Sequence, residues 1–241
     1  MTYPFQEPKS MNARLNYAIV FAVVSFLPLV GIAAEGDGFK PLFDGKSLTG
    51  WDGVEKFWSV KDGAITGQTT AENPTKGNTF LIWKGGDVGD FELRLKFRIV
   101  GGNSGVQYRS TDLGNHVVGG YQSDIEAGDK FIGILYDEKG RGILAQRGDK
   151  VEITADGKKN IVGKTGDAAE IAASVKKEDW NDLVIIAKGN HLIQKLNGHT
   201  TVDVTDNQTS KAKASGILAL QLHAGPPMLV QFKDIQLKEL K

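Results

Sequence analysis

The chain of 241 residues contains no cysteine, and that absence excludes several classes of protein at once. Thiol catalysis, disulfide frameworks, Cys-ligated zinc, iron–sulfur clusters and a lipid anchor on cysteine all require a residue that is missing. The chain also lacks an excess of either charge, because 29 Lys and Arg balance 29 Asp and Glu. A nucleic-acid-binding protein is therefore not expected, since the electrostatic footprint for a phosphate backbone is absent.

Motifs for common cofactors are missing as well. The sequence has no glycine-rich phosphate loop between a strand and a helix, no Gly-x-Ser-x-Gly, and no His/Asp cluster with zinc-ligand spacing. We therefore expect no metal and no cofactor in the site. A structural Ca²⁺ on Asp- or Asn-bearing loops is compatible with the composition, but no segment places it.

Only one long hydrophobic run occurs, and it lies near the N-terminus. Lys9 and Arg14 precede the apolar stretch 15–34, which contains Pro28 and ends in Gly-Ile-Ala-Ala. A basic start, an apolar segment and a small-residue end predict a secretory signal peptide over residues 1–34. Met11 is an alternative start that would give a more compact basic region. The protein is then periplasmic or secreted, with no stable membrane span in the mature chain. The alternative is a membrane anchor through residues 15–34, which approach the length of about 20 residues that spans a bilayer.

The rest of the chain has the pattern of an all-β protein. Thirty glycines separate short apolar runs, and residues 91–99 alternate five apolar with four charged side chains. That alternation is typical of an antiparallel strand with one buried face. Asn190 and Asn197-Gly198 fall where hairpin turns are expected, a short helix is compatible with 167–177, and Lys233-Asp234 breaks the last strand like a β-bulge. We predict one domain over residues 35–241, a two-sheet jelly-roll sandwich. The other expected strands are 58–60, 64–66, 79–83, 106–109, 121–125, 133–136, 183–187, 191–196, 217–223 and 230–237.

Several of these strands carry unusual side chains on the face that points away from the core. A solvated sheet face would show Lys, Glu and Thr, as residues 92–98 do. Side chains that can hydrogen-bond and stack on polyols, and that include acids and bases, indicate instead a concave sugar-binding face. The alternation places on that face Gln107, Arg109, Gln122, Asp124, Tyr136, Glu138, Gln221 and His223. Glu126 has the same parity as Asp124.

Eight motifs in register cover residues 39–241. They are FKPLFDGKSLTGW at 39–51, DFEL at 90–93, NSGVQYRS at 103–110, GYQSDI at 120–125, GILYDEKGR at 133–141, EDWN at 178–181, LQLHAGPP at 220–227 and VQFKDI at 230–235. The chain with these motifs resembles the DUF1080 family, the 3-keto-disaccharide hydrolase domain. The resemblance implies a concanavalin A-like jelly roll in a secreted or periplasmic bacterial protein. It also implies cleavage of glycosides already oxidised to a ketone at C3.

Such a substrate requires a defined set of groups. A C3 ketone acidifies the C2 proton, so a base can form an enolate, the C1 substituent can leave, and water can add back. Asp124 or His223 could be the base, and Glu138, Tyr136 or His223 the proton donor. Arg109 or Arg141 could hold the enolate or ketone oxygen. We expect Gln107, Gln122 and Gln221 to hydrogen-bond the substrate.

Two other functions fit the same residues. A conventional glycosidase needs two carboxylates, and Asp124 and Glu126 have a spacing that permits the shorter separation of about 5 Å. A non-catalytic, lectin-like carbohydrate-binding module would use the same surface without acid–base groups. The two classes differ at Asp124 and His223, because only an enzyme needs perturbed pKa values there. In either case the partner is a small-molecule or oligosaccharide ligand.

Overall fold

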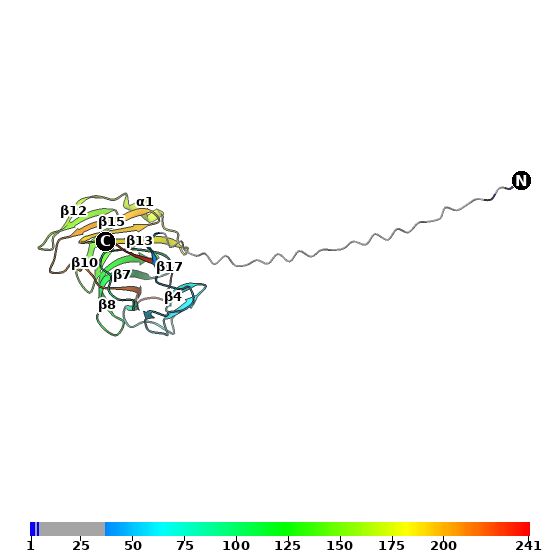
Figure 1. Cartoon of the computed structure of the whole chain (residues 1–241), viewed down its shortest axis with the longest axis horizontal. Coiled ribbons are helices and arrows are strands. Elements are labelled where there is room, and N and C mark those ends of the chain that lie inside the picture. Colours follow the sequence, from blue (N-terminus) through cyan, green and yellow to red (C-terminus); the bar gives the residue numbers. More distant parts are fainter. Residues whose placement is uncertain (3, 5–36) are drawn as a thin grey trace. The chain divides into compact units, whose positions relative to one another are not determined.

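The computed structural model describes residues 1, 2, 4 and 37–241. The expected signal peptide, the alternative start Met11 and the alternative anchor lie outside these residues, apart from the first few. No helix in the described part of the chain is long and apolar enough to cross a membrane. Residues 37–241 form a two-sheet sandwich, so the all-β jelly-roll prediction is confirmed. In Figure 1, β12, β15 and β13 run along one side of this body, and β10, β7 and β8 run along the other.

The larger sheet has ten strands. Its centre is β6, which pairs with β13 on one side and with β17 on the other. In spatial order the strands are β12 (Lys159–Lys164), β11 (Asp149–Ile153), β15 (His199–Asp206), β14 (His191–Leu196), β13 (Asn181–Lys188), β6 (Phe91–Val100), β17 (Leu229–Glu239), β4 (Ala64–Gln68) and β3 (Trp58–Lys61), with β1 (Lys40–Pro41) paired to β17.

The smaller sheet has seven strands and carries most of the residues singled out above. In spatial order they are β10 (Gly142–Ala145), β9 (Leu135–Glu138), β8 (Val118–Glu126), β7 (Asn103–Asp112), β16 (Ile217–Leu222), β5 (Thr79–Trp83) and β2 (Trp51–Asp52).

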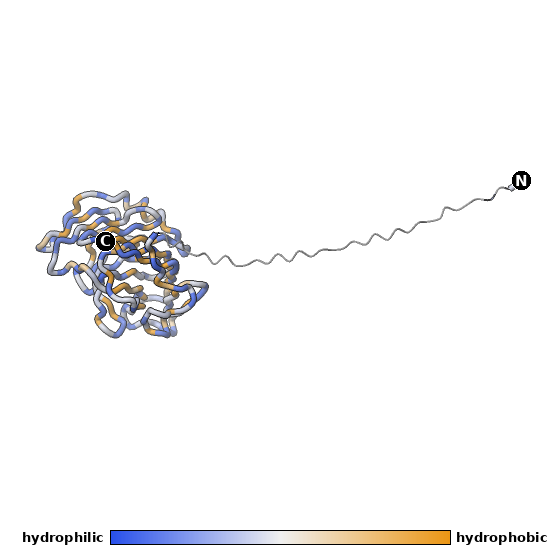
Figure 2. Tube along the Cα trace, in the orientation of Figure 1, coloured by the Kyte–Doolittle hydropathy of each residue, from blue (hydrophilic) through white to orange (hydrophobic). Residues whose placement is uncertain are grey.

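The core lies between the two sheets and follows from the alternation. On β6 the side chains of Phe91, Leu93, Leu95, Phe97 and Ile99 are all buried, while the charged residues between them are not. Along the folded body, short hydrophobic and hydrophilic stretches follow one another (Figure 2). Facing β6, the smaller sheet contributes residues of β7, β8 and β16 to the same apolar cluster. Each large buried side chain adds about 1.5–3 kcal/mol of transfer free energy.

The two predicted hairpin turns and the predicted β-bulge are confirmed, and the predicted helix is shorter than 167–177. The β13–β14 and β14–β15 hairpins turn at Gly189-Asn190 and Asn197-Gly198, where Asn197 adopts a φ of 48° and Gly198 one of 86°. The register of β17 on β6 slips between Lys233 and Gln236. The helix α1 spans only Ala168–Ala173. Asp167 caps its first turn, and Ile171 is its one buried residue.

The face of the smaller sheet that points away from the core, here called the outer face, has two halves. A second, smaller apolar cluster of Phe80, Ile82, Val118 and Ala219 covers the half over β5 and β16. The backbone N–H of Phe80 donates to the carbonyl of His116 at 3.0 Å, so the turn that follows β7 lies against this half. The remaining half, over β7, β8 and β9, carries the polar side chains.

Candidate functional site

Strand register brings the polar residues of the outer face together in rows. Gln122 of β8 stands opposite Tyr136 of β9 on one side and opposite Gln107 of β7 on the other. In the next row Asp124 stands opposite Gly105. A Cβ on Gly105 would lie 2.5 Å from the side chain of Gln122, so glycine at this position leaves the space that the Gln122 amide occupies.

A pocket of about 350 Å³ lies over these rows. Six of the nine expected site residues line it: Gln122, Asp124, Tyr136, Glu138, Gln221 and His223. Its remaining lining residues are Asn78, Asn103, Glu126, Phe131, Ile134 and Ile143. The pocket therefore has three carboxylates, one imidazole and four side-chain amides, and no Lys or Arg among its lining residues. Such a lining suits a neutral polyol better than an anion.

The carboxyl group of Asp124 is the most perturbed acid of this pocket. Its side chain lies on a nearly buried strand position with 7% of its surface exposed. Burial, together with the nearby charges of Glu138 and Glu126, raises the pKa of Asp124 to about 7, against hydrogen bonds from Gln122 and Asn103 that lower it. An acid with a pKa near the ambient pH suits general acid–base catalysis, because both protonation states are accessible.

His223 follows β16 and presents one ring nitrogen to a defined partner. Its Nδ1 lies 2.5 Å from the carbonyl oxygen of Ala224. Because a carbonyl only accepts, Nδ1 carries a proton, and the lone pair of the neutral ring is on Nε2. The next residue is held in turn, since the backbone N–H of Ala224 donates to Oδ1 of Asn78. His223 therefore reaches the pocket in a fixed tautomer.

Gln221 supplies an unusual feature, a buried amide without a partner. Its side chain is fully buried, and neither Nε2 nor Oε1 has a hydrogen-bond partner in the described structure. Leaving a buried polar group unpaired costs about 1–3 kcal/mol, so such groups call for an explanation. Gln221 lines the pocket, and a ligand that offers both a donor and an acceptor would satisfy it.

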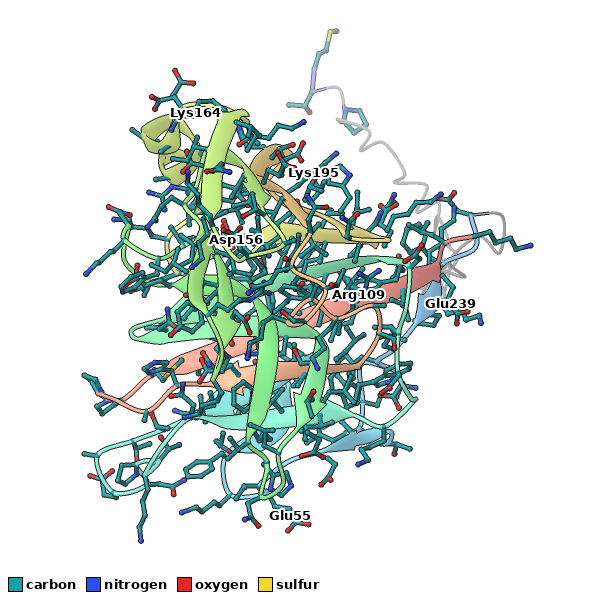
Figure 3. All side chains as sticks on the ribbon, turned by 90° about the vertical axis from the view of Figure 1, so that its left-hand side faces the viewer. Glu55, Arg109, Asp156, Lys164, Lys195 and Glu239 are labelled. Atoms are coloured by element: carbon teal, nitrogen blue, oxygen red, sulfur yellow. The ribbon has the colours of Figure 1, made fainter. Side chains whose placement is uncertain are left out.

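Arg109, an expected ligand-binding residue, does not line this pocket. Its side chain is 1% exposed; Nε donates to the carbonyl of Gly89 at 2.8 Å, Nη1 to that of Gly189 at 2.6 Å, and Nη2 to Oδ1 of Asp90 at 2.7 Å. In Figure 3 it lies amid the strands, whereas Glu55 and Glu239 lie at the periphery. The register of β7 on β8 shifts between Tyr108 and Thr111, and Arg109 adopts a φ of 46°, so the strict alternation ends before it.

Arg141 and Gln107 also lie off the pocket. Arg141 pairs with Asp137 at 2.6 Å and with Asp206 at 2.8 Å, so internal carboxylates neutralise its charge. It lines a separate depression of about 410 Å³ that shares Glu138 with the first pocket. Gln107 is fully buried beneath the pocket and donates from Nε2 to Oε1 of Gln122 at 2.7 Å.

Several lining residues were missed by the strand pattern. Asn103 has the same parity as Gln107 on β7. The predicted strand 106–109 began too late to include it. Glu126, by contrast, was not missed, because the pattern placed it on the same side as Asp124; its Oε2 accepts from the backbone N–H of Phe131 at 2.6 Å. Asn78 and Phe131 lie outside strands, where no periodicity applies. In the part of the chain described here, no three His, Asp or Glu side chains converge as a metal site.

These features define a class: a jelly-roll sandwich with a polar pocket on the outer face of its smaller sheet. The chain belongs to the 3-keto-alpha-glucoside-1,2-lyase-like domain family, whose sequence profile matches residues 38–238. This confirms the resemblance inferred from the motifs.

Individual relatives are more distant. A 3-keto-disaccharide hydrolase of Bacteroides thetaiotaomicron is 29% identical over 92 residues, which cover 34% of this chain and 31% of that protein. The match thus spans about a third of the relative's length. A candidate glycosyl hydrolase from Parabacteroides distasonis is 23% identical, with a TM-score of 0.56 over 84% of this chain and 99% of the other. The carbohydrate-binding module CBM66 of Bacillus subtilis is 13% identical, with a TM-score of 0.53 over 79% and 96%. Both solved structures share the fold.

Proposed function

We propose that the pocket binds a glycoside oxidised to a ketone at C3 and cleaves its C1–O bond. Asp124 removes the C2 proton, and the C2–H electrons form the enolate with the C3 oxygen. The enolate then expels the C1 substituent, which takes a proton from a donor, and leaves an enone. Water adds at C1 and a proton returns to C2, so the net reaction is hydrolysis. The proposal depends on one observation above others: the buried Asp124 carboxyl shares a pocket with the unpartnered amide of Gln221.

Gln221 has the chemistry to hold the reacting oxygen. The two arginines expected in that role are engaged elsewhere, by the carbonyls and carboxylates described above. An N–H of the Gln221 amide would donate to the C3 oxygen, and Oε1 would accept from a neighbouring hydroxyl of the same ring. A donor aimed at a developing oxyanion in a site with little water typically contributes about 3–4 kcal/mol.

Three side chains that line the pocket can supply the proton to the leaving oxygen: Tyr136, Glu138 and His223. Glu138 lies on β9 two residues beyond Tyr136, and His223 faces the same pocket from the end of β16. A protonated His223 donates from Nε2, because Nδ1 is committed to the carbonyl of Ala224.

The leaving group of the substrate separates base from acid. We would compare 3-keto-trehalose with 4-nitrophenyl 3-keto-glucoside, whose nitrophenolate leaves without protonation. Asp124→Asn should abolish turnover of both. The variant of the true donor, Tyr136→Phe, Glu138→Gln or His223→Ala, should turn over the disaccharide about 100-fold more slowly, the usual contribution of a general acid, and keep its activity on the nitrophenyl substrate. Gln221→Met should slow both.

Controls define what would contradict the proposal. Unoxidised trehalose should be inert, and Asp182→Asn, an exposed aspartate on the other sheet, should behave as the wild type. In D₂O the wild type should place deuterium at C2 of the product, and Asp124→Asn should not. Turnover of unoxidised trehalose at a similar rate would overturn the ketone route. Binding of the keto-sugar without turnover would favour the lectin-like module.

A further inference from the structure

A chain of buried side chains runs beneath the pocket and ends on Asp124. The hydroxyl of Ser110 lies 2.6 Å from Oε1 of Gln107. Nε2 of Gln107 lies 2.7 Å from Oε1 of Gln122, whose Nε2 lies 2.6 Å from Oδ1 of Asp124. All four residues are less than 10% exposed, so the chain is largely shielded from bulk water.

In this direction, here called the carboxylate direction, each group donates a hydrogen bond to the next one toward Asp124. The last hydrogen bond is donated to Asp124, so this direction fits an ionised Asp124, which can only accept. Because the oxygen and nitrogen of an amide occupy nearly the same positions after a 180° turn, the same heavy-atom positions permit the opposite direction.

The opposite direction is also complete. A protonated Asp124 donates to Gln122, Gln122 donates to Gln107, and Gln107 donates to the Ser110 oxygen. The Ser110 hydroxyl then needs an acceptor, and two are present: the backbone carbonyls of Tyr108 at 3.1 Å and of Tyr121 at 3.3 Å. In either direction each side-chain oxygen and nitrogen along the chain keeps at least one partner.

We propose that Ser110, Gln107 and Gln122 form a reversible relay whose direction follows the protonation state of Asp124. The relay rests on the proposed function, in which Asp124 alternates between the two states in each cycle. Gln107 and Ser110 are positioning residues, because neither reaches the pocket. They hold Asp124 at the same place whether it is an acid or a base.

Other charged groups around Asp124 do not reproduce this coupling. Glu126 on its own strand and Glu138 on β9 act on Asp124 through charge, and Asn103 on β7 donates to it. His223, at the end of β16, faces it across the pocket. None of them contacts Ser110 in the hydrogen bonds of the described residues.

Removing the remote hydroxyl predicts a definite change at Asp124. In Ser110→Ala, the carboxylate direction leaves the side-chain carbonyl of Gln107 without a donor. The opposite direction instead leaves a side-chain N–H of Gln107 without an acceptor. Unpaired buried N–H groups are rarer than under-satisfied carbonyls, so the carboxylate direction is favoured. The pKa of Asp124 should therefore fall, by about half a pH unit if the two directions come to differ by most of the net contribution of one hydrogen bond.

The test is an NMR titration of the full-length protein without substrate. The ¹³Cγ signal of Asp124 and the side-chain ¹⁵N signals of Gln122 and Gln107 should titrate with one midpoint. In Gln122→Met, the Gln107 signal should stop following pH while Asp124 still titrates. Ser123→Ala is the matched control, because Ser123 is a buried neighbour of Asp124 whose hydroxyl has no partner in the described residues, and it should leave the midpoint unchanged.

Two results would overturn the relay. One is a Gln107 signal that does not change while Asp124 titrates, and the other is an equal pKa change in Ser110→Ala and Ser123→Ala. Because no substrate is present, failure of the relay is distinct from failure of the proposed function. An active enzyme whose Gln107 ignores pH rejects the relay alone. Shared titration in a protein that cleaves no keto-sugar rejects the proposed reaction alone.

Discussion

Replacing Asp124 by asparagine should stabilise the protein at neutral and alkaline pH. The folded state raises the pKa of Asp124 from an ordinary 3.8 to about 7, because burial penalises its charged form. An acid whose pKa is higher in the folded than in the unfolded state makes its full contribution to stability at pH values below its pKa in the unfolded state. That contribution is lost as the pH rises through its pKa in the folded state. The difference between 3.8 and about 7, at about 1.4 kcal/mol per pH unit, corresponds to on the order of 4 kcal/mol. Wild type should therefore lose this amount between pH 4 and pH 7, relative to Asp124→Asn.

Asparagine has nearly the same shape as aspartate, so wild type and Asp124→Asn differ mainly in the charge at this position. Its Oδ1 can still accept from Nε2 of Gln122, now 2.6 Å from the carboxylate oxygen. Urea unfolding followed by tryptophan fluorescence at pH 4.5, 6, 7 and 8 would give the free energy of unfolding of both proteins. Other titrating groups cancel in the difference between them. In thermal unfolding, the full effect would raise the Tm of the variant by about 8–16 °C at pH 8 for a domain of this size.

The outcome that refutes the reasoning is a difference that does not depend on pH. If Asp124→Asn changed stability equally at pH 4.5 and pH 8, the carboxyl would have the same pKa in both states of the chain. Asp182→Asn provides the control, since Asp182 is exposed and pairs with Lys96 on the outside of the larger sheet. Its effect should be within about 1 kcal/mol at every pH.

Three further predictions concern residues around the site. Arg109→Met should cost about 3–5 kcal/mol, measured by urea unfolding, because the carbonyls of Gly89 and Gly189 lose their buried donor; a stable variant with impaired sugar binding would contradict the structural role. Gly105→Ala should reduce sugar affinity in calorimetry with little change in Tm, because its methyl group would displace the flexible end of Gln122; unchanged affinity would show that the amide does not shape the pocket. Asp167→Ala should lower stability by about 1 kcal/mol through loss of the cap of α1, and an unchanged Tm would show that the cap contributes nothing.

The sequence predicted the fold well because one face of most strands is buried. Alternation over residues 91–99 located β6, and the same parity rule separated Val106 and Tyr108 in the core from Gln107 on the outer face. No strand was predicted at β10, β11, β12 or β15. On β11 the buried and exposed residues do alternate, so the period-two signal was present there and was overlooked. β12 is different, because it lies at the edge of the larger sheet and most of its residues are exposed, including Ile161 and Val162. A strand without a buried face has no period-two signal to detect.

The site was predicted as far as the strands remain regular. Gln122, Asp124, Tyr136 and Glu138 reach one pocket because β8 and β9 pair without a shift. Arg109 departs from the pattern at the irregularity of β7, and a bulge of this kind leaves no clear mark in a single sequence. Whether a side chain is free or engaged, as for Arg141, depends on partners distant in the chain, so the sequence alone could not decide it.

The missing cation in the pocket has a consistent explanation in the proposed reaction. Forming an enolate adds a negative charge to a pocket that already contains Asp124, Glu126 and Glu138, with no Lys or Arg in its lining. The charge does not accumulate, however, because Asp124 becomes neutral when it takes the C2 proton. The negative charge moves from the carboxylate to the C3 oxygen, where the Gln221 amide would receive it, and the total charge of the pocket is unchanged. The pKa of about 7 lowers the cost of that transfer, since a base with an ordinary pKa near 3.8 would hold the proton some three powers of ten less firmly. In the proposed reaction the desolvated carboxyl of Asp124 would be the base and the unpartnered amide of Gln221 the neutral donor, so no cation is required.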